Sequence, residues 1–289
     1  MKRRSLLTLL FTTTVAVSAL TSCEPPQPGQ NPTSNSGKKV LILVTSPDYP
    51  PYQFYDTASG GRKIVGFDID IANRIADELG FELKINESDF NGLIPALQAK
   101  RADFVMAGMT PTPERKKNVD FSVIYFEAKN TIIAPKASNL RTIKDLEGKT
   151  VGVQLGSIQE GDAKKIAAKV PGMKVKQLNK VPDLIQEIKS KRIDAAIVED
   201  TVAKGFTDSS PDLAFTVIPP EGPSGSAIAF PLGSPLVPDF NKVLEKMIAS
   251  GEIKTLSAKW FAKSAPPAPA ASPTASPSDA MSPVPSKSP

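Results

Sequence analysis

The sequence predicts an α/β fold built on largely parallel sheets. Short apolar runs typical of buried strands alternate along the chain with amphipathic segments typical of helices. These runs are Val40 to Val44, Phe104 to Ala107, Val151 to Val153 and Ile193 to Val198. The part of the chain between its two proline-rich ends is long enough for two modest domains or one large domain.

The segment from Asp68 to Gly80 has the periodicity of a helix that packs on a sheet. Ile71, Ile75 and Leu79 recur every four residues and form one apolar stripe. Asp68 and Asp70 fall at the start of this helix, where a carboxylate can accept free backbone N–H bonds and suits the positive end of the helix dipole. We interpret both acids as helix caps.

A strand-to-helix turn follows the run that ends at Ala107. Gly108 permits a tight turn, Thr112 can cap the next helix, and Pro113 suits the first helical position. Arg115 then lies in the first helical turn, where a cation is unfavourable next to the helix dipole. Its position therefore predicts an anion that Arg115 meets.

A second turn has the same plan. Gly156 follows a strand, and Ser157 to Glu160 matches a capping box. Free N–H groups at a helix start bind carboxylate or phosphate, so the two turns and the Arg115 guanidinium suit one carboxylate held from both sides. Spacing alone leaves two well-capped helices without a ligand as an equal alternative.

Composition excludes several classes of site. Cys23 is the only cysteine and histidine is absent, so neither a disulfide nor a histidine- or thiolate-ligated zinc site can form. The chain has no GxxxxGK[ST] and no GxGxxG after a strand, which argues against nucleotide binding. We expect no cofactor and no metal.

The charge argues against nucleic acid as a partner. The net charge of +5 falls to +2 once Lys2, Arg3 and Arg4 are removed with the first 22 residues. A nearly neutral chain with scattered charges lacks the basic patch that nucleic acid requires.

Both ends of the chain have the composition of unfolded segments. Residues 1–22 form a predicted signal peptide, because a basic start precedes an apolar block that is too short to span a membrane. Residues 23–38 contain four prolines and predict a flexible tether. Residues 263–289, rich in Pro, Ala and Ser, predict a disordered tail without a binding role, and a segment that docks to the cell wall or to a partner is the alternative.

The sequence Leu20-Thr21-Ser22-Cys23 resembles the lipobox of bacterial lipoproteins. The resemblance implies that Cys23 receives diacylglycerol and becomes the first residue of an exported protein anchored to the membrane, on its periplasmic or extracellular face. An ordinary signal peptide followed by an incidental cysteine is the alternative.

The segment GFDIDIANRIADEL, residues 66–79, resembles the signature of family 3 bacterial extracellular solute-binding proteins, the amino-acid receptors of ABC importers. The segments TSPDYPPYQF, DFNGLIPALQAKRADFVMAGMT, PERKKNVDFS, DLEGKTVGVQLGS and RIDAAIVEDTVA follow this family in order and spacing. The resemblance implies the two-lobed periplasmic-binding-protein fold of type II, with two hinge crossovers. Lobe 1 would comprise residues 39–126 and 227–262, and lobe 2 residues 131–224.

The resemblance also implies a site for a free amino acid. Its carboxylate would meet Arg115, Gly108 and Thr110 from lobe 1, and Ser157 with the N–H of Ile158 from lobe 2. The ligand amine would meet Glu199, together with Gly108 and Thr110. Asp200 is the nearest rival of Glu199, although its side chain would point to the opposite face of a strand.

The implied side-chain pocket is lined by Tyr49, Tyr52, Phe90, Ser46, Gln154 and Gln159. Tyr52 could equally belong to the core. Several relatives have aspartate in place of Ser46, so its absence weakens a preference for lysine or arginine and leaves glutamine open.

The expected function is to capture a polar or basic amino acid and deliver it to the permease subunits of an ABC importer, as a monomer and without catalysis. The alternative is an exported dehydratase of the cyclohexadienyl or arogenate type on the same fold, with Glu199 as a general acid if burial raised its pKa.

Overall fold

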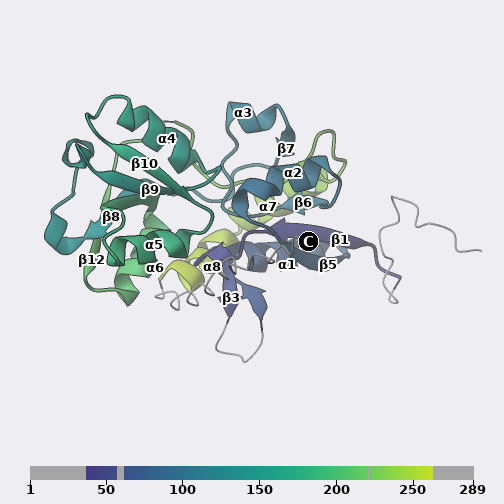
Figure 1. Cartoon of the computed structure of the whole chain (residues 1–289). Coiled ribbons are helices and arrows are strands. Elements are labelled where there is room, and N and C mark those ends of the chain that lie inside the picture. The colour runs from purple at the N-terminus through teal and green to yellow at the C-terminus, as the bar shows by residue number, and fades with distance from the viewer. Residues whose placement is uncertain (1–36, 57–61, 221, 263–289) are drawn as a thin grey trace, which may run out of the picture. The chain divides into compact units, whose positions relative to one another are not determined.

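The computed structural model describes residues 37–56, 62–220 and 222–262. The predicted signal peptide, Cys23, nearly all of the tether 23–38 and the tail 263–289 lie outside this part of the chain. Within it, the strands form two mixed five-stranded sheets and one small three-stranded sheet (Figure 1).

The first sheet has the strand order β5-β1-β6-β13-β7. Strand β1 is parallel to both β5 and β6, whereas β13 is antiparallel to β6 and β7. The strands are β1 (Val40–Thr45), β5 (Glu82–Glu87), β6 (Phe104–Val105), β7 (Val119–Phe121) and β13 (Ala229–Pro231). Strand β13 thus comes from a segment more than a hundred residues beyond the other strands of this sheet.

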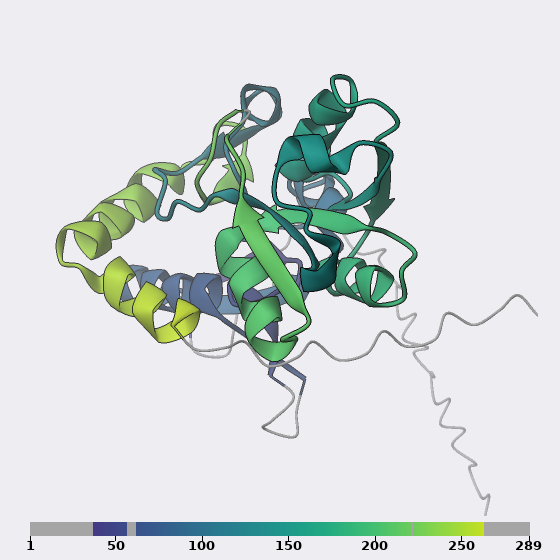
Figure 2. The same cartoon turned by 90° about the vertical axis from the view of Figure 1, so that its left-hand side faces the viewer.

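Helices cover both faces of the first sheet. The helices are α1 (Phe67–Leu79), α2 (Leu93–Gln98), α7 (Val237–Ala249) and α8 (Glu252–Phe261). Leu41 and Leu43 share a core cluster with residues of α1 and α7, while Val44 and Val105 share another with α2. In Figure 2 the yellow-green α7 and α8 lie beside the blue α1, far from it in sequence.

The second sheet has the order β10-β9-β11-β8-β12, with β8 antiparallel to both β11 and β12. The strands are β8 (Asn130–Pro135), β9 (Thr150–Gln154), β10 (Lys174–Leu178), β11 (Ala195–Glu199) and β12 (Leu213–Val217). The helices are α4 (Ile158–Ala167), α5 (Val181–Lys189) and α6 (Asp200–Ser209). Helix α4 packs on one face and α5 and α6 on the other.

Short elements complete the chain. They are β2 (Asp48–Tyr49), β3 (Gln53–Asp56), β4 (Lys63–Val65), α3 (Pro113–Lys116) and the 3-10 turns η1 (Phe90–Gly92), η2 (Lys136–Ser138) and η3 (Ile143–Leu146). Among the described residues, we find no helix with both the length and the hydropathy that a membrane crossing requires.

Two extended segments connect the sheets, one between β7 and β8 and the other between β12 and β13. They pair with each other, because Tyr125 N donates to Ser226 O at 3.0 Å and Ser226 N donates to Phe126 O at 2.7 Å. The chain therefore passes between the sheets along one paired strip.

The predicted stripe of the first helix is partly confirmed. Ile71 and Ile75 are fully buried, but Leu79 is 36% exposed because it is the last residue before the left-handed Gly80 that ends α1. The interpretation of Asp68 and Asp70 as caps is wrong. Gly66 occupies the N-cap position, and no side chain caps this helix. Asp70 instead accepts hydrogen bonds from Lys259 Nζ and Trp260 Nε1 of α8.

Candidate functional site

The turn before α3 places Arg115 as the sequence predicts. Thr112 Oγ1 caps the helix by accepting from Arg115 N at 3.2 Å, and Pro113 begins it. The guanidinium donates from Nη1 to Thr110 O at 2.8 Å and from Nη2 to Gly156 O at 2.9 Å. Both partners are neutral carbonyls, and no carboxylate of the described residues forms an ion pair with Arg115.

Burial lowers the pKa of Arg115 to about 10, so the guanidinium is still charged at neutral pH. It also lies over the Phe90 ring, with Cζ 5.4 Å from the ring centroid. A partly buried cation that has only neutral partners can stabilise an incoming anion.

The turn before α4 holds a capping arrangement that differs from the prediction in one bond. Ser157 Oγ accepts from Glu160 N at 3.2 Å, as a cap should. The Glu160 carboxylate, however, accepts from Gly156 N at 2.7 Å instead of Ser157 N, which donates to Gln154 O. The reciprocal half of the capping box is therefore shifted by one residue.

Gly108 lies in a left-handed turn, at a φ of 58°. A Cβ at this position would lie 3.3 Å from the Tyr49 ring, so a side chain would meet both backbone strain and a close contact. Gly108 N donates to Asp68 Oδ2 at 2.9 Å. The turn is therefore held by a carboxylate forty residues earlier in the chain.

Asp68 is a site-supporting residue that sequence reasoning missed. Its side chain is fully buried, and besides Gly108 it accepts from Tyr125 Oη at 2.9 Å. Burial raises the pKa of Asp68 to about 7, against the opposing effect of these two hydrogen bonds. The signal was available, because Asp68 precedes Ile71 and Ile75 by three and seven residues and so shares their buried face.

Glu199 ends strand β11 and is only 5% exposed. Its Oε2 atom is buried and accepts no hydrogen bond from the described part of the chain. Burial raises the pKa of Glu199 to about 8, while hydrogen bonding from the Tyr52 phenol acts in the opposite direction. Asp200 is already engaged, since it accepts from Lys129 N at 3.2 Å and from Thr201 N at 2.9 Å.

Most of the predicted site residues border one small cavity of about 10 Å³. The residues that line it are Tyr49, Phe90, Ala107, Gly108, Thr110, Arg115, Gln154, Ser157, Ile158, Gln159 and Glu199. Arg115 of α3 and Glu199 at the end of β11 therefore line the same cavity.

Two predicted pocket residues do not line this cavity. Tyr52 is fully buried, stacks on Tyr49 with ring centroids 5.4 Å apart, and contacts Phe67, Phe126 and Phe261. Ser46 is 2% exposed, and its hydroxyl donates to the Asp48 carboxylate. The structure therefore places both one layer behind the cavity wall.

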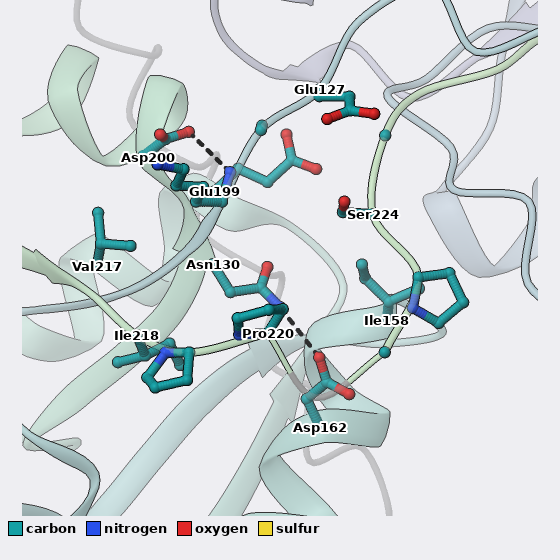
Figure 3. Close-up of a pocket in the computed structure, with 16 residues that line it drawn as sticks. Glu127, Asn130, Ile158, Asp162, Glu199, Asp200, Val217, Ile218, Pro220 and Ser224 are labelled. Carbon is teal, nitrogen blue, oxygen red and sulfur yellow. Dashed lines mark hydrogen bonds between the residues drawn. The ribbon is translucent and has the colours of Figure 1, made fainter.

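A larger cavity of about 530 Å³ adjoins the first, and Ile158 and Glu199 line both. Figure 3 shows Asn130 and Asp162 at one end of it and Glu127, Glu199 and Asp200 at the other. Four carboxyl side chains line it, and Lys129 is the only lysine or arginine of its described lining, so an amino acid carboxylate finds no guanidinium there. Of these two cavities, only the smaller combines Arg115 with Glu199, which makes it the candidate site.

Hydrogen bonds join the first-sheet region to the second around this cavity. Besides the bond from Arg115 to Gly156, Gln154 Nε2 and Val181 N donate to Asp48 Oδ2 at 2.9 and 3.0 Å. Asn179 Nδ2 donates to Asp89 Oδ2 at 3.1 Å. The cavity wall is therefore assembled from both sides.

Residues 41–263 match the model of the bacterial extracellular solute-binding proteins, family 3. The arginine-binding extracellular protein ArtP of Bacillus subtilis is 47% identical over 255 residues, which cover 88% of this chain and 96% of ArtP. An ancestral arginine-binding protein solved with arginine has a TM-score of 0.71 and 39% identity, over 78% of this chain and 99% of that one. An ancestral arginine-binding protein solved with glutamine has a TM-score of 0.70 and 40% identity over the same shares.

The chain belongs to the family 3 bacterial extracellular solute-binding proteins. The predicted family and the two-lobed α/β fold are thereby confirmed. The boundaries of the two lobes and the roles of the individual site residues stay predictions.

Proposed function

We propose that this protein captures L-arginine outside the cell membrane and delivers it to the permease subunits of an ABC importer. One observation carries the proposal. Arg115 and Glu199 border the same small cavity, and neither has a charged partner across it. A cavity lined by an unpaired cation and an unpaired acid matches the two poles of a free amino acid.

In the proposed complex, the ligand carboxylate replaces the backbone carbonyls on Arg115 and also meets Ser157 and the N–H of Ile158. The ligand ammonium meets Glu199 and the turn of Gly108 and Thr110. Burying a zwitterion is tolerable only when each charge is paired and hydrogen-bonded, and these groups supply both pairings.

Binding is coupled to closure of the two lobes in this proposal. Arg115 lies with the first sheet, while Ser157, Ile158 and Glu199 lie with the second. A ligand that contacts both sides binds the closed form better than the open form, and this difference in affinity drives closure.

Arginine is the proposed ligand because the relatives that support the family assignment point to it. The Bacillus subtilis relative is named as arginine-binding, and an ancestral relative was solved with arginine. Glutamine is the competing ligand, since an ancestral relative was also solved with it.

A thermal-shift screen of the twenty common amino acids with ornithine and citrulline tests the ligand. A ligand that binds only the folded protein raises the unfolding midpoint with the logarithm of its saturation. We expect arginine to give the largest rise. A larger rise with glutamine would identify that ligand instead, and a screen without any rise would contradict amino acid binding.

An exported dehydratase is the second candidate, and one observation favours it. The pKa of Glu199, raised to about 8 by burial, would keep this acid protonated at neutral pH, as a general acid requires. The family consists of solute-binding proteins, so we propose binding without catalysis. Product from prephenate or arogenate, absent with a Glu199→Gln variant, would favour the enzyme.

The proposal includes anchoring through a lipid on Cys23, which lies outside the described residues, and a monomeric protein. If Cys23 carries the anchor, a Cys23→Ala variant should leave the membrane fraction while it still binds arginine. Retention of this variant in the membrane fraction would contradict the anchor. Size-exclusion chromatography with light scattering tests the monomer.

A further inference from the structure

Gln154 lines the ligand cavity with its amide held in one orientation. Its Nε2 atom donates to Asp48 Oδ2 at 2.9 Å and to Asn179 O at 3.1 Å. Both partners are pure acceptors when Asp48 is ionised, so the nitrogen must face them. Neither Asp48 nor Asn179 lines the cavity, so Oε1 is the amide atom of Gln154 that is left available to a ligand.

Gln159 lines the same cavity and is held in an equivalent way. Its Nε2 donates to Asn130 Oδ1 at 2.9 Å. Asn130 is itself oriented, because its Nδ2 donates to Asp162 Oδ2 at 3.0 Å (Figure 3). The carboxylate of Asp162 thus fixes Asn130, which engages Nε2 of Gln159 and leaves its Oε1 as the amide atom available to a ligand.

We propose that Asp48 and Asp162 are positioning residues that turn Gln154 and Gln159 into acceptor-only groups, so that the cavity selects a ligand side chain made of donors. This inference rests on the proposed function and names the feature that distinguishes arginine from its neutral analogues. A guanidinium offers N–H donors and no acceptor, and it therefore complements two carbonyl oxygens.

Several relatives have aspartate in place of Ser46, and in this protein Asp48 supplies a negative charge close to that position. Ser46 does not line the cavity, yet its hydroxyl donates to Asp48, whose other oxygen accepts from Gln154 and Val181. Burial raises the pKa of Asp48 to about 6, so it is mostly ionised at pH 7.5. Asp48 has no cationic partner among the described residues, so its negative charge lies behind Gln154, outside the lining of the cavity.

Citrulline is the probe that isolates this selection. It has the shape of arginine, but a carbonyl oxygen replaces one guanidinium nitrogen. An amide that is fixed with its oxygen toward the ligand repels that carbonyl, whereas an amide free to rotate can donate to it. The measured quantity is the citrulline Kd divided by the arginine Kd, obtained by calorimetry at pH 7.5 for the full chain. A high ratio means selection for arginine.

We expect Asp48→Ala to lower this ratio about tenfold or more, because it removes one of the two acceptors that hold the Gln154 amide and leaves only Asn179 O. Asp48→Asn should keep the ratio within about threefold of the starting protein, since its Oδ1 can still accept from Gln154 and Val181. An effect on lobe closure weakens both ligands alike and cancels in the ratio.

Asp89→Ala is the matched control, because Asp89 also joins the two sheets, through Asn179, but touches neither glutamine. Its ratio should not change. If Asp48→Ala does not fold, Asn130→Ala tests the same idea on the Gln159 side and should also lower the ratio.

Three results would overturn the inference. An unchanged ratio in Asp48→Ala or Asn130→Ala would contradict the positioning role alone, as long as the starting protein prefers arginine. A decrease of the Kd ratio in Asp48→Asn equal to that in Asp48→Ala would assign the effect to the charge of Asp48 instead of the orientation of the amide. A starting protein that binds arginine no better than citrulline would contradict the proposed function as well.

Discussion

Arg115 and Glu199 differ in how their surroundings treat charge. Arg115 has two hydrogen-bond acceptors and keeps its charge, whereas Glu199 Oε2 has no donor among the described residues and burial raises the pKa of this carboxyl to about 8, which favours its protonated form at neutral pH. The ligand-free site therefore holds a net positive charge on this pair. A zwitterion restores the balance by giving Arg115 an anion and Glu199 a cation.

Removing the guanidinium should abolish most of the affinity. We expect Arg115→Ala to weaken arginine binding by about 3 to 5 kcal/mol, a hundredfold to several thousandfold in Kd, because the ligand carboxylate is left buried and unpaired. Calorimetric titration measures the loss. Arg192→Ala, which removes an exposed arginine paired with Glu187, is the control. A loss below tenfold would remove Arg115 from the site.

Binding should release a proton from Glu199. The ligand ammonium favours the ionised acid, so it lowers a pKa that burial has raised to about 8. At pH 7 we expect release of about one proton per ligand, and an affinity that increases with pH up to about 8. Calorimetry in buffers of different ionisation enthalpy measures the release.

Glu199→Gln should eliminate this proton release, whereas Asp200→Asn should not alter it. In the ligand-free protein the folded pKa lies above the unfolded value of 4.5, so stability falls as the pH rises from 4.5 to about 8. Proton uptake on binding, in place of release, would contradict the assigned partner of the ammonium.

At the scale of elements, the first turn of α1 supports the binding turn at Gly108. Asp68 comes from this helix and accepts both Gly108 N and the Tyr125 phenol, while Gly66 leaves the helix without a side-chain cap. The helix thus gives up a capping interaction and places its carboxyl behind the site.

Asp68→Ala should destabilise the protein by about 2 to 5 kcal/mol, because two buried donors lose their acceptor. Asp68→Asn should lose less, since its amide can still accept from Gly108 N. Urea unfolding measures both. The folded pKa of about 7 lies above the unfolded value of 3.8, so the contribution of Asp68 to stability falls as the pH rises from 3.8 to about 7. Asp70→Ala, at the surface, is the control and should cost about 1 kcal/mol.

At the scale of the whole molecule, two turns, one from the part of the chain that carries each large sheet, approach closely at Gly156 and Asn91. Gly156 lies at the start of α4 in the second-sheet region, and a Cβ added to it would lie 3.1 Å from Cβ of Asn91 in the first-sheet region. Its φ of 78° also favours glycine. This glycine therefore permits the approach that a ligand must stabilise.

Gly156→Ala should weaken the binding of arginine by about tenfold, because the methyl group opposes closure. Gly148→Ala is a matched control, with a similar φ of 69° and no atom within 4 Å of the added Cβ. Both variants should lose about 1 to 2 kcal/mol of stability from the left-handed backbone. Equal affinities in the two variants would show that this contact does not limit closure.

The sequence predicted much of the site but not its supports. Arg115, Ser157 and Glu199, which line one cavity, could be proposed from the sequence because strand-to-helix turns and a family signature are local patterns. Asp48, Asp68 and Asp162 were missed, because their roles depend on partners between 32 and 133 residues away. The sequence could not decide whether Tyr52 belongs to the core or to the pocket wall, because this also depends on distant residues. In the structure Tyr52 stacks on Tyr49, which lines the cavity, but does not line it itself.

The sequence by itself determined the family, the alternation of strands and helices, and the two turns that hold Arg115 and Ser157, because each depends on residues close in the chain. Only the tertiary structure decided which polar atoms are left without a hydrogen-bond partner among the described residues. Glu199 Oε2 has no hydrogen-bond partner among the described residues while Asp200 is satisfied, and the amide nitrogens of Gln154 and Gln159 are engaged, because packing brings distant donors and acceptors to one atom of each pair and not to the other.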